Sequence, residues 1–231
     1  MKTRPLYMHE EVLLLALCDE KGTLHSGAWL QPALAGAILA EFLSTGRIRL
    51  EKEGKQEVVA ITRDNTFGDN LLDDCLEKIR SSSKRHTVQH WSGLIGCRGD
   101  LMPGTAEGLC RIGVLRTDEK KVLLIFSLKI YPEIDPKPEA ELLDRMRAVI
   151  FDDSAEVDTR TTMLIAIAHR TGLLRANFDK GELKRCKERI EGIAKGEFAG
   201  EAAQGAINAQ SAAFLLTTMM PLIMMPTMTG R

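Results

Sequence analysis

The chain has 231 residues, of which 44% are hydrophobic and 27% charged, and this composition is typical of a globular protein rather than a disordered chain. Lys and Arg number 31 against 32 Asp and Glu, so the net charge of −1 excludes a broadly basic nucleic-acid-binding protein. The aromatic share of 5% disfavours a β-sandwich. Five cysteines without a CxxC motif predict reduced thiols that act as small apolar side chains.

Apolar residues recur mainly at helical spacing, which predicts a mainly α fold: a compact multi-helix single domain with one or two small β-hairpins. The predicted helices cover residues 10–17, 32–44, 69–81, 87–95, 101–112, 139–150, 159–169, 182–195 and 201–219. The predicted strands cover residues 48–51 and 57–61 in one hairpin, and 114–115 and 122–130 in a second whose polar turn is placed at 117–121.

The C-terminal segment stands out because residues 202–230 contain no acidic or basic side chain. Its length is sufficient to span a bilayer, but Pro221 and Pro226 interrupt it, which favours a buried or surface-docked helix with a frayed end. We therefore expect one domain over residues 1–213, followed by an apolar, uncharged tail over 214–231. The charged first residues and the short apolar run after them are not typical of a secretory signal peptide.

No group of residues indicates catalysis. The glycine-rich phosphate-binding motifs and the nucleophile motif GxSxG are absent, and the acidic pairs at 73–74 and 152–153 fit helix ends. His86 and His90 have the spacing of helical metal ligands, but no third ligand is well placed, so two partly exposed helical histidines are expected. The sequence predicts a protein that is not an enzyme and holds no metal or cofactor.

A winged helix is an alternative, because a helix, a glycine and a hairpin follow one another twice. The candidate recognition helices are residues 32–44, without a single Lys or Arg, and residues 101–112, with Arg111 alone. Because groove reading and phosphate neutralisation both need cations or amides, nucleic acid is not an expected partner.

The second hairpin carries the most apolar strand-like run in the chain. Buried between helices, this run would be ordinary core; exposed, it would contact a membrane or a second subunit. The flanking lysines add attraction to an anionic membrane surface, and core or subunit interface on one side and membrane contact on the other stay open. The apolar residues are Val122, Leu123, Leu124, Ile125, Phe126 and Leu128, and the lysines are Lys120, Lys121 and Lys129.

Several motifs, in order, make the chain similar to the Golgi phosphoprotein 3 family over about residues 6–213. They are EEVLLLAL and DEKG within 10–22, LAGAILAE and GRI within 34–48, GDNLLD at 68–73, VQHW at 88–91, GVL at 113–115, YP at 131–132, DTRT at 158–161, and GLL at 172–174 followed by Phe178. Each motif is short, and their order and spacing together carry the resemblance to a bacterial-type member of the family.

The resemblance implies a mainly α-helical, non-enzymatic adaptor that is cytoplasmic and peripherally associated with a membrane. Characterised eukaryotic relatives bind phosphatidylinositol 4-phosphate on Golgi membranes. The implied partners are anionic lipid or phosphoinositide head groups and a membrane surface, which the hairpin over residues 119–130 would contact. The alternative is a soluble homo-oligomeric interaction module that uses the same hairpin and has no lipid site.

The family's head-group residues match this sequence at few positions. Trp29 lies about three residues after the family's tryptophan position, and Arg98 lies one place before that of the first arginine of a pair. Gly99 and Met102 stand at the aligned positions of that pair, and Ala35 stands where the family has an arginine in its second helix. Because phosphate recognition prefers bidentate arginine, we expect weak head-group binding through Arg98 and Trp29.

Overall fold

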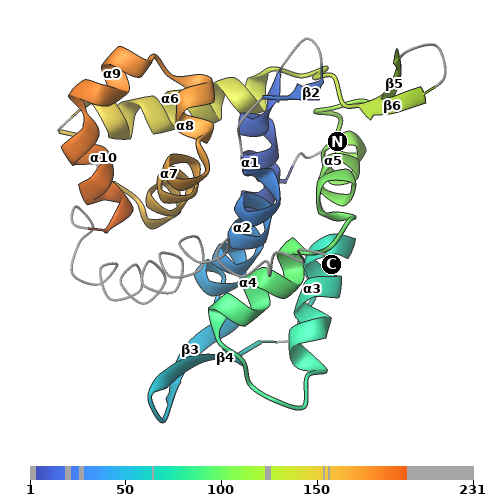
Figure 1. Cartoon of the computed structure of the whole chain (residues 1–231), viewed down its shortest axis with the longest axis vertical. Coiled ribbons are helices and arrows are strands. Elements are labelled where there is room, and N and C mark those ends of the chain that lie inside the picture. Colours follow the sequence, from blue (N-terminus) through green and yellow to red (C-terminus); the bar gives the residue numbers. More distant parts are fainter. Residues whose placement is uncertain are drawn as a thin grey trace, which may run out of the picture.

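The computed structural model describes residues 4–18, 22–25, 29–63, 65–122, 126–152, 154–155 and 157–196. Helices dominate these residues, and their strands form three separate two-stranded antiparallel sheets (Figure 1). The predicted mainly α architecture with small hairpins is confirmed. The helix expected at 201–219 and the tail at 214–231 lie outside the described residues.

The helices of the described part are α1 (Met8–Ala16), α2 (Leu30–Ser44), α3 (Asn70–Arg80), α4 (Val88–Gly96), α5 (Leu101–Arg111), α6 (Lys137–Phe151), α7 (Thr159–Thr171), α8 (Leu173–Asn177), α9 (Lys180–Arg185) and α10 (Lys187–Ala194). The strands are β1 (Leu17–Cys18), β2 (Thr23–Leu24), β3 (Ile48–Glu53), β4 (Gln56–Ile61), β5 (Asp118–Val122) and β6 (Phe126–Ile130). Each pairs with its neighbour in sequence.

The core is built around α1 and α2, which lie between α6–α10 on one side and α3–α5 on the other (Figure 1). Every residue of α1 is buried, and so is most of α2, including Leu34, Ile38 and Phe42. Apolar residues on all sides of these two helices match a central position in the fold. Because α2 is buried, it offers no surface to a nucleic-acid groove, which argues against it as a recognition helix.

Side-chain caps define where several helices begin. The carboxylate of Asp69 accepts a hydrogen bond from Leu72 N–H at the start of α3, and Asp158 does the same for Thr161 at the start of α7. The hydroxyl of Thr87 caps α4. Each cap satisfies an N–H that the first helical turn leaves without a partner, which is why these helices start close to their predicted positions.

The structure differs from the local predictions in three places. The helix expected at 182–195 is divided at Cys186 into α9 and α10, and the short helix α8 was not foreseen. The strands β1 and β2 form a third hairpin that the sequence did not indicate. The residues expected as a polar turn at 117–121 lie mostly in β5. Backbone hydrogen bonds to β6 hold this strand, and because the hairpin is exposed its side chains can be polar.

Candidate functional site

The hairpin β5–β6 projects from the helical body (Figure 1). Its register pairs Asp118 with Ile130 and Val122 with Phe126, so Val122 ends β5 and Phe126 and Leu128 lie in β6. Leu123, Leu124 and Ile125 lie outside the described residues, and Val122 and Phe126 are placed by the backbone register alone.

The outer strand positions of this hairpin are exposed. Leu128 is 53% exposed and lies opposite Lys120 in the register, and Lys129 lies opposite Glu119. Lys121, opposite Ser127, precedes the apolar residues directly. An apolar side chain and two lysines therefore stand on backbone that projects into solvent.

The base of the hairpin is tied to the core by backbone hydrogen bonds. Tyr131 follows β6, is 3% exposed, and donates its N–H to the carbonyl of Gly22 at 2.9 Å. Arg116 N–H donates to the carbonyl of Pro132 at 3.0 Å. The strands thus extend from a fixed base, which sets the direction in which the hairpin points.

Arg98 follows α4 and is already engaged by carboxylates of its own chain. Its Nε and one terminal nitrogen donate to the two oxygens of Asp100 at 2.8 and 2.6 Å, and Asp74 lies 3.6 Å away. The hydrogen bond from Arg98 holds the pKa of Asp100 below its usual value. The guanidinium side chain is 13% exposed. An anionic head group would have to displace Asp100 to reach it.

Trp29 precedes α2 directly and is 54% exposed. Its backbone N–H donates to the carbonyl of Thr171, which ties this end of α2 to α7. Among the described residues, Trp29 and Arg98 share no ring–cation contact.

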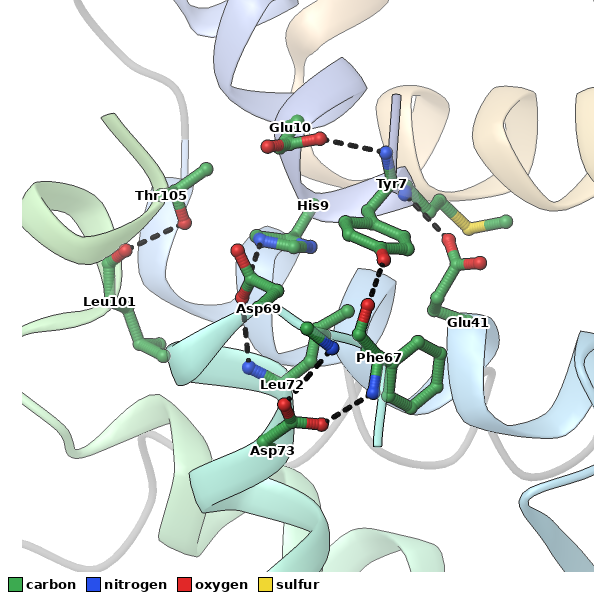
Figure 2. A network of polar contacts seen from close by, with 12 residues as sticks. Tyr7, His9, Glu10, Glu41, Phe67, Asp69, Leu72, Asp73, Leu101 and Thr105 are labelled. Carbon is green, nitrogen blue, oxygen red and sulfur yellow. Dashed lines mark hydrogen bonds and ion pairs between the residues drawn. The ribbon is translucent and has the colours of Figure 1, made fainter. Parts of the chain in front are cut away.

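A buried polar network joins the start of α1 to α2 and α3 (Figure 2). His9 and Glu10 are fully buried, and Asp69 is 2% exposed. Both oxygens of Glu10 accept hydrogen bonds from Arg4 at 2.7 Å, and Arg111 lies 3.2 Å from Asp69. The carboxylates are thus neutralised by guanidinium groups within the chain.

The same network contains aromatic contacts around Phe67. The hydroxyl of Tyr7 donates to the carbonyl of Phe67 at 2.6 Å, and the Tyr7 and Phe67 rings meet edge to face (Figure 2). Phe67 N–H donates to Asp73 at 2.7 Å. These bonds hold the segment before α3 against the start of α1.

His9, Glu10 and Asp69 are the only group in the described part of the chain whose ligand atoms are close enough to hold a metal, all within 4.8 Å. A cation there would face Arg4 and Arg111, which already bind the two carboxylates, so the arrangement favours an internal network over a metal centre. His86 and His90 were expected on one helix, but His86 precedes α4. Its ring stacks on that of His90 with centroids 3.9 Å apart.

Burial lowers the pKa of His9, although Glu10, Asp69 and Glu41 nearby oppose this shift. The unfolded chain, with a His pKa near 6.5, then binds more protons than the folded protein just below that pH. We predict that the free energy of unfolding falls as pH drops from 7.5 to 5.5, with a slope of up to about 1.4 kcal/mol per pH unit. Urea midpoints at several pH values measure this slope.

His9→Phe keeps a ring of similar size and removes the titrating group, so it should flatten the pH dependence. His90→Phe, at an exposed position, serves as the control and should retain it. His169, whose pKa is also lowered, contributes in the same direction and leaves a residual slope in both variants. An unchanged slope in His9→Phe would exclude His9 as its source.

A comparison with protein families places most of this chain in one family. The model of the family described as Golgi phosphoprotein 3 (GPP34) matches residues 8–210. The chain belongs to this family. The match extends over α1 to α10 and both larger hairpins, so the resemblance seen in the short motifs is confirmed.

Family membership makes the environment of Ala35 informative. Ala35 is fully buried, and a Cβ added to Gly96 in α4 would lie 3.7 Å from its Cβ. Ala35 therefore packs against α4 at ordinary contact distance, and the space between the two helices is filled by small side chains. Gly99, in contrast, has open space around it. Among the described helices, none is long and apolar enough to cross a membrane.

Proposed function

We propose that this protein is a peripheral, non-enzymatic membrane adaptor whose hairpin β5–β6 contacts an anionic membrane from the cytoplasmic side. The observation that carries the proposal is the projecting hairpin, whose strands expose Leu128, Lys120 and Lys129. The family supports it, because Golgi phosphoprotein 3 proteins are non-catalytic adaptors and are linked to lipid binding.

The expected binding is general for anionic lipid rather than specific for a phosphoinositide. Burying one large apolar side chain contributes about 1.5–3 kcal/mol, and each lysine near an anionic leaflet adds about 1 kcal/mol. The expected head-group residues contribute less to membrane binding, because Arg98 already forms hydrogen bonds with Asp100 and α4 packs against Ala35. Trp29 adds an exposed ring that fits a membrane interface.

Co-sedimentation with vesicles tests this function. We predict that Leu124→Asp and Phe126→Asp each weaken binding to anionic vesicles at least about tenfold, since each replaces an apolar side chain that would enter the membrane with a negative charge. Gln56→Asp, on the hairpin β3–β4, adds the same charge and should bind like the wild type. Adding phosphatidylinositol 4-phosphate to vesicles of equal charge should change little.

Equal binding by Phe126→Asp and the wild type would exclude the hairpin as the membrane contact. A wild-type chain that binds no vesicle and forms oligomers by light scattering would favour the alternative, a soluble homo-oligomeric module. One observation favours that alternative: the outer edges of β5 and β6 carry no third strand among the described residues, and such edges can pair with a second copy.

A further inference from the structure

A second cationic surface lies away from the hairpin and from Arg98. A cleft of about 530 Å³ opens between α7, α8, α9 and α10. This size falls within the range of small-molecule sites, roughly 300–1,000 Å³. Its lining residues are His169, Leu174, Arg175, Lys180, Leu183, Lys184, Lys187 and Ile190.

The cleft lining carries four cations and no carboxylate. Lys187 has an ion pair, to Glu191 at 3.8 Å, whereas Arg175, Lys180 and Lys184 have none with any described residue. The nearby acids are engaged elsewhere: Asp179 caps α9, and Glu182 lies 3.8 Å from Arg147. The lining itself therefore carries a net positive charge, with its nearest carboxylates outside it.

The floor of the cleft is apolar. Leu174 and Ile190 are each 2% exposed, and Leu183 packs partly buried against the core. A second cleft, between α6 and the start of the chain, differs because Glu11, Asp135 and Glu141 line it together with cations. Of these two clefts, only the one between α7 and α10 combines an apolar floor with charged lining residues that are all cationic. This pattern matches an anionic amphiphile.

His169 also lies in the lining. Its partial burial lowers its pKa, and so do Arg170 on its own helix, Arg175 on α8 and Lys187 on α10, while Glu191 on α10 opposes them. Lys180 and Lys184 of α9 also line the cleft. An anion bound among these cations would raise the pKa of His169, which makes the imidazole a reporter of occupancy.

We propose that this cleft binds an anionic phospholipid, with the phosphate among Arg175, Lys180 and Lys184 and the first part of an acyl chain on Leu174 and Ile190. The proposal rests on the proposed membrane function and names a second lipid site for it. Figure 1 places α8 and α9 toward the same end of the molecule as the hairpin β5–β6. The apolar floor favours lipid over an acidic peptide.

The first experiment uses monomeric dihexanoyl phosphatidylglycerol, which requires no membrane. We expect it to shift the NMR signals of cleft residues and to raise the pKa of His169, while dihexanoyl phosphatidylcholine does neither. Glycerol 3-phosphate, which lacks the chains, should bind more weakly. Equal binding of glycerol 3-phosphate would overturn the lipid as occupant in favour of a free phosphate group. Stronger binding of a poly-glutamate peptide would overturn it in favour of a protein.

The second experiment uses phosphatidylglycerol vesicles. Each cation near an anionic leaflet strengthens binding about fivefold, so Lys180→Glu/Lys184→Glu should weaken it at least about 25-fold. Lys52→Glu/Lys55→Glu, on the exposed hairpin β3–β4, makes the same charge change and should bind like the wild type. Lys180→Gln/Lys184→Gln should give an intermediate loss, which guards against an effect of misfolding.

The two experiments separate the two proposals. Binding of the monomeric lipid at the cleft without binding to any vesicle would contradict the membrane function and leave the cleft site standing. Vesicle binding that Lys180→Glu/Lys184→Glu leaves unchanged would overturn the cleft site and leave the hairpin proposal intact. NMR shifts confined to residues outside the cleft would also overturn it.

Discussion

Replacing Arg160 with methionine is expected to lower the free energy of unfolding by about 3–5 kcal/mol, because it removes one partner of buried ion pairs. Arg160 lies 2.9 Å from Glu11 and 3.1 Å from Glu41, and it donates to the carbonyl of Leu6 at 2.8 Å. Glu11 and Glu41 are 5% and 3% exposed. Glu11 keeps Arg145 at 2.8 Å, but Glu41 loses its guanidinium partner. Urea denaturation measures the loss.

A double variant separates lost charge pairing from lost packing. Glu41→Gln removes the charge and retains an oxygen that can accept the Met8 N–H, now 2.7 Å from the carboxylate. Arg160→Met/Glu41→Gln should therefore be more stable than Arg160→Met alone by about 1 kcal/mol or more. Arg80→Met is the control: Arg80 and Glu77 are more than half exposed, and its cost should stay below about 1 kcal/mol. A double variant no more stable than Arg160→Met would assign the loss to packing.

Gly22→Ala is expected to cost about 3 kcal/mol or more, because no side chain fits at this position. Gly22 has a φ of +57°, and a Cβ there would lie 2.3 Å from Pro132 N and 2.4 Å from the carbonyl carbon of Tyr131. The backbone at the base of the hairpin β5–β6 would have to move away. Besides thermal or urea unfolding, tryptic cleavage at Lys129 should accelerate as the base of the hairpin loosens.

Gly54→Ala is a matched control for the backbone conformation alone. Gly54 has a φ of +63° but nothing within 4 Å of an added Cβ, so its cost should be about 1–2 kcal/mol. The difference between the two variants then measures the close approach of Gly22 to Tyr131 and Pro132. Equal costs would show that this approach contributes nothing to stability.

Local patterns were sufficient to predict most helices, and the reasons are visible in particular residues. Asp69, Thr87 and Asp158 cap α3, α4 and α7, so the signals that start these helices lie within a few residues of them. The hairpin β3–β4 was predicted for the same reason, since its turn contains Gly54. The second hairpin was also predicted, but its first strand was misplaced, because β5 is charged and shows no apolar alternation although it pairs residue for residue with β6.

The candidate sites depended more on contacts that are distant in sequence. The sequence singled out the hairpin, whose apolar residues and lysines are neighbours in the chain. The sequence did not reveal that the Arg98 guanidinium is bound by Asp100. The two residues are close in sequence, but their geometry depends on the turn after α4. The cleft cations were missed as a group, since Arg175, Lys180 and Lys187 lie on three different helices.

The sequence by itself determined the family, the mainly α fold and the position of the apolar hairpin, because each rests on residues within one segment or on the order of short motifs. Only the tertiary structure decided which polar groups meet. Glu11 and Glu41 meet Arg160 across more than a hundred residues of chain, α4 closes the space beside Ala35, and four cations gather around one apolar floor. Such charge neighbours are set by how helices pack, and the spacing of residues along one helix does not contain that information.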